Sequence, residues 1–95
     1  MMMLSEARNA MRGVLNGNDA KYTSVEIDTR RLESDALYFA IQGEKQNGHR
    51  FIAMAMQAGA AAVVADQSFP EEAATCHIRV EDTTLALGEL ARHWR

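Results

Sequence analysis

The 95-residue sequence contains one cysteine and one proline, and it has neither a long apolar run nor an excess of basic residues. The single cysteine, Cys76, excludes an internal disulfide and fits a reducing compartment. The run Met1 to Leu4 is too short for the apolar region of a signal peptide, and no stretch approaches the roughly 20 apolar residues of a membrane span. The net charge of −3 predicts no basic surface for nucleic acid. We therefore expect a cytoplasmic protein with neither a membrane nor a nucleic acid as partner.

Several motifs of catalysis and cofactor binding are also missing. None of the six glycines is followed by lysine, so the P-loop G-x-x-x-x-G-K-[ST] is absent, and so is G-x-G-x-x-G. His49, His77 and His93 lack metal-ligand spacing, and nothing near Cys76 in sequence would activate a nucleophilic thiol. We expect no metal site and no cofactor in this chain, and we name no catalytic residue. An ATP-using enzyme complete in 95 residues is disfavoured for the same reason.

Composition and length favour one small globular domain. Hydrophobic residues make up 47% of the chain and charged residues 24%, which is typical of a folded domain. A chain of this size has room for a single hydrophobic core. We predict one α/β domain over residues 1–95, with a mixed sheet of about four strands, a strand–helix–strand crossover and three helices.

The N-terminal third predicts a helix and then a strand. The apolar residues Ala7, Ala10, Met11, Val14 and Leu15 follow helical spacing, with a serine as N-cap before them and Gly17 as the stop. Beyond the turn chemistry of residues 16–19, residues 22–27 are rich in strand-forming side chains. We expect that strand to end near residue 28.

The middle of the chain predicts a crossover between two parallel strands. After a turn at residues 33–35, the apolar segment Leu37 to Ile41 is followed by a polar loop and by a helix whose apolar stripe contains Phe51, Met54, Ala55 and Ala58. Gly59 ends this helix, and the continuous apolar run from residue 60 to residue 65 is typical of a strand that is buried on both faces.

The C-terminal third predicts one more strand and a last helix. Residues 76–80 alternate, so that His77 and Arg79 are expected to face solvent. Asp82 then suits the N-cap of a helix with a stripe formed by Leu87, Leu90, Ala91 and Trp94.

The polar loop after the Leu37 to Ile41 strand is the strongest functional signal from the residues alone. It contains Gly43 and Gly48 and opens a helix, so that backbone N–H groups and a helix N-terminus lie at the carboxyl edge of a sheet. Open α/β sheets bind ligands at this edge. This pattern favours a site for a polar small molecule or a nucleotide, although turn geometry alone also explains the two glycines.

The same stretch resembles the N-terminal domain of the Mur ligases of peptidoglycan synthesis. That family's hallmark is D-[ST]-R, a spacer, and then [LV]-[FY]-x-A-[LIV]-x-G-x-x-x-[DN]-G-H-x-[FY]. The matching residues here are Asp28-Thr29-Arg30, Leu37 to Ala40, Gly43, and Asn47-Gly48-His49-Arg50-Phe51. The segments Val80 to Thr83 and Leu87 to Ala91 resemble the VxDTxxALGxLA pattern of the family's D-alanyl-D-alanine-adding ligases. One departure is Ser34-Asp35, where the family usually has proline and glycine.

The resemblance implies that this chain holds the uridine and pyrophosphate end of UDP-N-acetylmuramoyl-tripeptide. Thr29 would offer a hydroxyl to uracil, while Arg30, Lys45 and the helix N-terminus would face the pyrophosphate. His49 is as well suited to fixing the loop as to touching the ligand, and the arginine pair at 30 and 31 would by composition alone be a solvated face. The implied substrate-binding residues are Ile27, Thr29, Arg30, Gly43, Glu44, Lys45, Gln46, Asn47, Gly48 and His49.

The resemblance also implies a longer enzyme, of which residues 1–95 are a fragment. Its central domain would bind ATP and Mg²⁺, and its C-terminal domain would bind D-alanyl-D-alanine. The whole would be an ATP-dependent amide-forming (acid–amino-acid) ligase, while this chain alone would be inactive. Two alternatives stay open: the same domain of the ligase that adds the third residue of the peptide, which the segment Asp82 to Ala91 disfavours, and a non-catalytic interaction module of the same fold.

Overall fold

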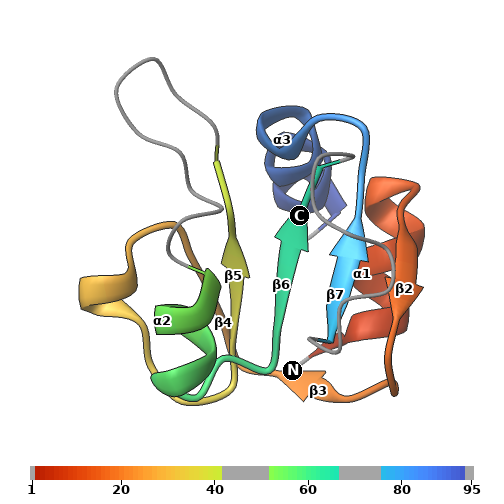
Figure 1. Cartoon of the computed structure of the whole chain (residues 1–95). Helices are drawn as coiled ribbons and strands as arrows, with labels where there is room; N and C mark the ends of the chain where they lie inside the picture. Colours follow the sequence, from red (N-terminus) through yellow and green to blue (C-terminus); the bar gives the residue numbers. More distant parts are fainter. Residues whose placement is uncertain (1, 42–51, 67–75, 94–95) are drawn as a thin grey trace.

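The computed structural model describes residues 2–41, 52–66 and 76–93, apart from the side chain of Thr29. Its centre is a five-stranded sheet in the order β2-β7-β6-β5-β4 (Figure 1). The strands β4, β5, β6 and β7 are parallel, and β2 runs antiparallel to β7. The bounds of these strands are Val14–Asn16 (β2), Ser24–Glu26 (β4), Ala36–Phe39 (β5), Ala62–Ala65 (β6) and His77–Arg79 (β7). The predicted α/β fold with a mixed sheet is confirmed, and the sheet has one strand more than expected.

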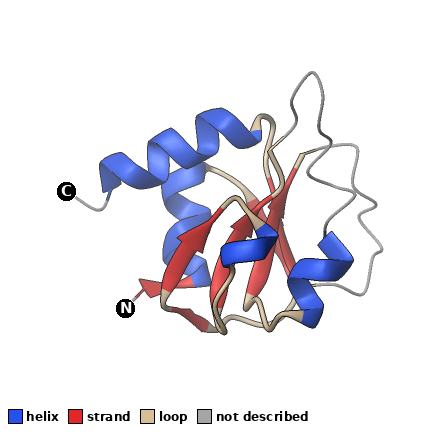
Figure 2. Cartoon of the chain, turned by 90° about the vertical axis from the view of Figure 1, so that its left-hand side faces the viewer, coloured by secondary structure: helices blue, strands red, loops and turns tan. Residues whose placement is uncertain are grey.

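A short ribbon and three α-helices complete the fold. β1 (Met2–Met3) pairs antiparallel with β3 (Lys21–Tyr22). The helices α1 (Leu4–Met11) and α3 (Thr83–His93) cover one face of the sheet, and α2 (Ile52–Gln57) and the 3₁₀ turn η1 (Thr29–Arg31) lie on the other side (Figure 2). The expected three helices are therefore present.

The two central strands are buried on both faces. Along β5, Leu37 and Phe39 pack into the core under α1 and α3, whereas Tyr38 packs under α2. In β6, Val64 packs into the core under α1 and α3, and Val63 packs under α2. This arrangement confirms the prediction from the continuous apolar runs, because a parallel strand covered by helices on both sides has no solvent face.

The expected helix up to Leu15 is wrong beyond Met11. The helix ends in a Schellman motif, in which Arg12 is left-handed with φ 56° and Gly13 N–H donates to Arg8 O at 2.9 Å. A Cβ at Gly13 would lie 2.7 Å from Ile78 Cγ2. Only glycine therefore fits where the chain passes from α1 into β2. The next residues then pair with β7 as β2. Sheet pairing has overridden helical periodicity.

Other local expectations also needed correction. The expected N-cap Ser5 is inside α1, and Met3 precedes the helix. The strand expected over residues 22–27 is split between β3 and β4 and ends at Glu26, not at residue 28. His77 is fully buried rather than exposed, because it shares a face of the sheet with its partners in register, buried Val63 of β6 and Asn16 of β2. Its ring nitrogen Nε2 is 3.3 Å from Asn16 Nδ2.

The apolar stripes of the two later helices are narrower than expected. In α2, Ile52 and Ala55 are buried, whereas Met54 is 51% exposed and the following Ala58 is also exposed. In α3 the buried residues are Thr83, Ala86 and Leu90; Leu87 is partly buried and Ala91 is exposed. Phe51 and Trp94 lie outside the described residues.

Two predicted helix-end signals and one predicted turn are confirmed. Gly59, with φ 98°, ends α2. Asp82 Oδ1 accepts the N–H groups of Thr84 at 2.9 Å and Leu85 at 3.0 Å and so caps α3. Asp35 takes the left-handed conformation, φ 65°, and its N–H donates to Gly59 O at 2.8 Å. An aspartate thus fills the position where the resemblance led us to expect glycine.

Candidate functional site

The candidate site is at the carboxyl end of β4. Because β4 to β7 are parallel, their carboxyl ends lie along one edge of the sheet, which is the upper edge in Figure 1. This is the edge at which open α/β sheets bind ligands. Of the predicted site residues, Ile27, Thr29 and Arg30 occupy the turn after β4. The others, residues 43–49, lie outside the described residues.

Two carboxylates organise this turn. Glu26 Oε1, at the end of β4, accepts the N–H groups of Ile27 at 2.9 Å and Asp28 at 3.1 Å. Asp28 Oδ1 then accepts the N–H of Arg30 at 2.9 Å, and Asp28 O accepts the N–H of Arg31 at 3.0 Å. The turn therefore folds into η1 because its first free amides are satisfied locally, as at a helix N-cap.

Asp28 also holds the side chain of Arg30. Arg30 Nε donates to Asp28 Oδ1 at 3.2 Å, and Nη2 donates to Oδ2 at 3.1 Å. This forked pair lowers the pKa of Asp28 below its usual value and raises the pKa of Arg30. The Arg30 side chain is 87% exposed. A guanidinium has five N–H donors, so the fork leaves three of them for a ligand.

Ile27 follows β4 directly, and Tyr38 of β5 is the partner in register of Glu26 at the end of β4. Ile27 is 54% exposed. Tyr38 is buried in the core under α2, and burial together with the charge of Asp28 raises the pKa of its hydroxyl. The turn therefore combines an exposed apolar side chain with an oriented cation.

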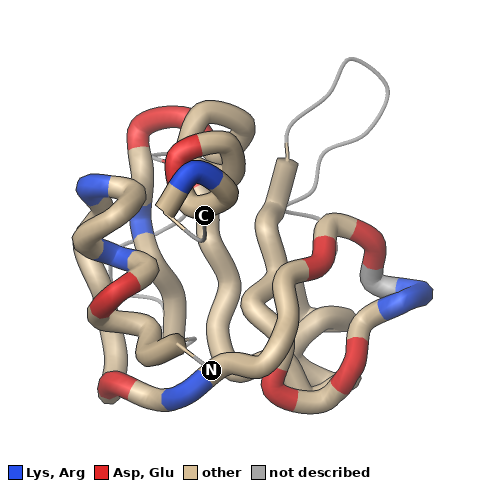
Figure 3. The backbone as a smooth tube through the Cα atoms, turned by 180° about the vertical axis from the view of Figure 1, so that it is seen from behind, with Lys and Arg blue, Asp and Glu red and all other residues tan. Residues whose placement is uncertain are grey.

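The charge of the turn is balanced. Along the segment that carries η1, acidic residues lie on both sides of the arginine pair (Figure 3). Glu26 and Asp28 offset Arg30 and Arg31. Arg30 therefore acts through its orientation rather than through a strongly positive surrounding field, and further positive charge for a pyrophosphate would have to come from elsewhere.

Sequence reasoning missed the roles of Glu26 and Asp28. The family motif contains Asp28 but indicates no role for it, and no sequence motif points to Glu26. A usable signal was present, since carboxylates at both positions follow a strand and precede an arginine pair. Short acidic side chains that accept nearby backbone N–H groups are typical of such turns.

Other chemistry finds little support in the described residues. Within residues 2–41, 52–66 and 76–93, no group of three or more His, Cys, Asp or Glu could hold a metal ion. Burial raises the pKa of the half-buried Cys76 thiol, which is the opposite of an activated thiolate. In the same part of the chain, no helix has the length and apolar character needed to cross a membrane.

Comparison with known proteins decides the family. The pattern described as "Mur ligase family, catalytic domain" matches residues 21–95. This chain belongs to the Mur ligase family. The N-terminal-domain fold expected from the motif is thereby supported by a match over most of the chain.

Two kinds of Mur ligase are similar to this member of the family. A UDP-N-acetylmuramoyl-tripeptide--D-alanyl-D-alanine ligase of Bacillus subtilis is 42% identical over 69 residues, which is 72% of this chain and 15% of the relative. A UDP-N-acetylmuramoyl-L-alanyl-D-glutamate--2,6-diaminopimelate ligase of Bacteroides thetaiotaomicron is 35% identical over 94 residues, which is 95% of this chain and 19% of the relative. This Mur ligase chain thus spans about a fifth or less of the length of these relatives.

Solved Mur ligases share the fold. MurF from Acinetobacter baumannii matches with a TM-score of 0.74 and 25% identity, over 90% of this chain and 19% of the other. MurF ligase from Thermotoga maritima, solved in complex with ADP, matches with a TM-score of 0.64 and 24% identity, over 74% of this chain and 16% of the other. The small α/β domain with its mixed sheet is therefore a fold of Mur ligases.

Proposed function

We propose that this chain anchors the UDP end of UDP-N-acetylmuramoyl-tripeptide for an ATP-dependent ligase that adds D-alanyl-D-alanine. The observation that carries the proposal is Arg30, an exposed guanidinium held by Asp28 at the carboxyl edge of the parallel strands. A cation oriented before binding loses little side-chain freedom when an anion arrives. Family membership indicates which anion to consider.

The proposed contacts follow the chemistry of the ligand. Uracil presents one N–H donor between two carbonyl acceptors, so Thr29 and backbone groups supply the complementary hydroxyl, donors and acceptors. Exposed Ile27 offers an apolar surface to the base or ribose. Arg30 and Lys45 take the pyrophosphate. The loop residues Gly43, Glu44, Gln46, Asn47, Gly48 and His49 complete the proposed site.

The choice of ligase rests on the C-terminal helix. Asp82 caps α3, and the segment Asp82 to Ala91 resembles the D-alanyl-D-alanine-adding ligases. Four of the relatives have that activity in their names. The main alternative is the ligase that adds the third residue, because relatives named for 2,6-diaminopimelate addition match this chain at comparable identity.

The whole enzyme is proposed to act in the cytoplasm in peptidoglycan precursor synthesis, and so in cell-wall formation and cell division. ATP with Mg²⁺, bound by domains beyond these residues, would phosphorylate the terminal carboxylate of the peptide. The amine of D-alanyl-D-alanine would then displace phosphate from the acyl phosphate to form the amide. This chain contributes substrate binding to that scheme, and we assign it no catalytic residue.

A backbone-amide NMR titration tests the anchoring role. The labelled chain is titrated with UDP-N-acetylmuramoyl-tripeptide, UDP and ATP. We expect weak binding of the two uridine nucleotides, no detectable binding of ATP, and shifts confined to residues 27–30 and 43–49. The choice between the two kinds of ligase is tested separately. Both additions, of D-alanyl-D-alanine and of the third residue, are assayed in the full-length ligase.

Two substitutions and a matched control sharpen the titration. Arg30→Ala and Thr29→Ala should each weaken UDP binding, Arg30→Ala by about tenfold, the usual effect of one lost charge-assisted hydrogen bond. Arg31→Ala removes the same charge from the neighbouring exposed position and should change binding little. Equal binding of ATP and UDP, or no response to either substitution, would contradict the assignment and favour an interaction module that has lost the ligand.

A further inference from the structure

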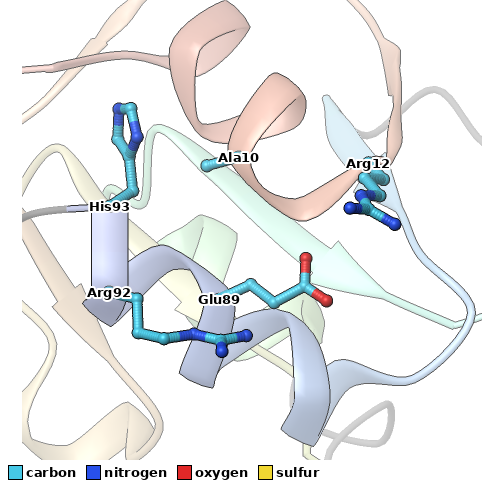
Figure 4. Close-up of a pocket in the computed structure, with 5 residues that line it drawn as sticks. All are labelled: Ala10, Arg12, Glu89, Arg92 and His93. Atoms are coloured by element: carbon cyan, nitrogen blue, oxygen red, sulfur yellow. The ribbon is translucent and has the colours of Figure 1, made fainter.

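A pocket of about 380 Å³ lies between α1 and α3, on the opposite side of the sheet from η1 and α2 (Figures 2 and 4). It is lined by Ala10 and Arg12 from the end of α1, and by Glu89, Arg92 and His93 from the last turns of α3. The pocket is open to solvent and is lined mainly by charged and polar groups. The proposed uridine site uses none of these residues.

The charge of this pocket is opposite to that of the chain. The chain has a net charge of −3, but the pocket brings together two guanidinium groups and an imidazole against one carboxylate. Within the described residues, none of these four side chains takes part in an ion pair within 4.0 Å. Among the described residues, the two guanidinium groups therefore face no competing carboxylate within 4.0 Å.

Arg12 reaches the pocket from a strained position. It is the left-handed residue of the Schellman motif, with φ 56°, where glycine is the usual residue. The glycine of this sequence is one position later, because a Cβ at Gly13 would collide with Ile78. A non-glycine residue with positive φ that faces a site is an observation from which function can be inferred.

The electrostatic interaction of basic side chains with a helix C-terminus explains only part of this group of basic residues. Basic side chains near a helix C-terminus interact favourably with the carbonyl groups there, which accounts for Arg92 and His93 at the end of α3. The packing of α1 against α3 adds Arg12 from a second helix to the same space. Figure 4 shows the Glu89 side chain extending from α3 toward the side of the pocket where Arg12 lies.

We propose that this pocket binds a small oxyanion, a compound carrying phosphate or carboxylate groups, through Arg12 and Arg92; His93 also lines the pocket. Guanidinium groups form paired hydrogen bonds with both kinds of oxyanion. Glu89 competes with the ligand for the same cations. The site is independent of the uridine site, because the two lie on different faces of the sheet.

Inorganic phosphate and succinate are the probes, each compared with sodium chloride at equal ionic strength. A backbone-amide NMR titration of the 95-residue protein should show shifts at residues 10–12 and 89–93 with saturation in the millimolar range, about what a few exposed charged contacts provide. Saturation by phosphate alone identifies a phosphate site, and saturation by succinate alone identifies a carboxylate site. Shifts that follow ionic strength in the same way for all three salts would overturn the proposal.

Three substitutions give effects of different sign. Arg12→Gly should raise the melting temperature, because glycine prefers positive φ, while it weakens binding about tenfold; a purely structural arginine would change stability without changing binding. Arg92→Gln should weaken binding by a similar factor. Glu89→Gln should strengthen it, because the competing carboxylate is gone. Lys21→Ala removes one exposed positive charge from β3 and serves as the matched control. Weaker binding by Glu89→Gln, or an equal loss in Lys21→Ala, would contradict the proposal.

Discussion

Arg30 is held by Asp28 through a forked pair of hydrogen bonds, 3.2 Å from Nε and 3.1 Å from Nη2, while the arginine side chain remains 87% exposed. The same carboxylate accepts the backbone N–H of Arg30. Backbone and side chain of one residue are therefore oriented by a single acidic group. An exposed arginine otherwise samples many rotamers, and their loss on binding costs free energy.

We expect Asp28→Asn to weaken UDP binding several-fold, although it removes a negative charge from the neighbourhood of a pyrophosphate. The amide cannot accept the forked pair, so Arg30 would have to be ordered by the ligand. Isothermal calorimetry at two salt concentrations measures the effect. Glu33→Gln removes the same charge from an exposed position in the same loop and serves as the control. Tighter binding by Asp28→Asn would show that Asp28 mainly repels the ligand.

The stability of the chain should depend on pH through Asp19. Hydrogen bonds from Ser5 lower the pKa of the Asp19 carboxyl below its ordinary value of 3.8, and its Oδ1 lies 2.9 Å from Ser5 N in the first turn of α1. A depressed folded-state pKa contributes stability above the unfolded-state pKa, and this contribution is lost as pH falls through the folded-state pKa.

We therefore expect Asp19→Asn to lower the melting temperature at pH 7. The difference between the variant and the parent chain should shrink as pH falls from about 3.8 through the lower folded-state pKa, where the carboxyl of the parent chain becomes protonated. Thermal unfolding followed by circular dichroism between pH 2.5 and 7 measures this. A difference that is the same at every pH would mean that the carboxylate charge does not contribute.

Two glycines should respond to alanine with opposite signs. At Gly13 the added Cβ would lie 2.7 Å from Ile78 Cγ2 and 2.9 Å from the backbone oxygen of Arg79. We expect Gly13→Ala to lower the free energy of unfolding by about 1–3 kcal/mol through overpacking. At Gly88, inside α3, nothing lies within 4 Å of the added Cβ, and alanine should raise it by up to about 1 kcal/mol.

Urea unfolding of the two variants tests this pair of expectations. The parent chain serves as reference, and each variant is the control for the other because the chemical change is identical. A neutral effect at Gly13 would mean that β2 and β7 can separate to admit a methyl group without loss of pairing.

The sequence identified the crossover, because its strands and end signals depend on residues that are near neighbours in the chain, whereas the site residues stay a prediction. Hydrophobic runs located β5 and β6, and Asp82 was recognised as a cap because it precedes the apolar stripe of the last helix. The family motif placed Ile27, Thr29 and Arg30 in one turn, and the structure places them after β4. The loop residues 43–49 remain a prediction.

What the sequence by itself determined is the α/β class, the central strands, the end signals at Gly59 and Asp82, and the family. Only the tertiary structure decided that α1 stops at Met11, that His77 is buried beside Asn16, and that Arg12 and Arg92 line one pocket. The physical reason is how far apart in the sequence the interacting residues are. Caps and periodicity depend on residues a few positions apart, whereas the contact between Asn16 and His77 joins residues 61 positions apart. Such a contact exists only once the sheet has formed, so neither segment indicates it alone.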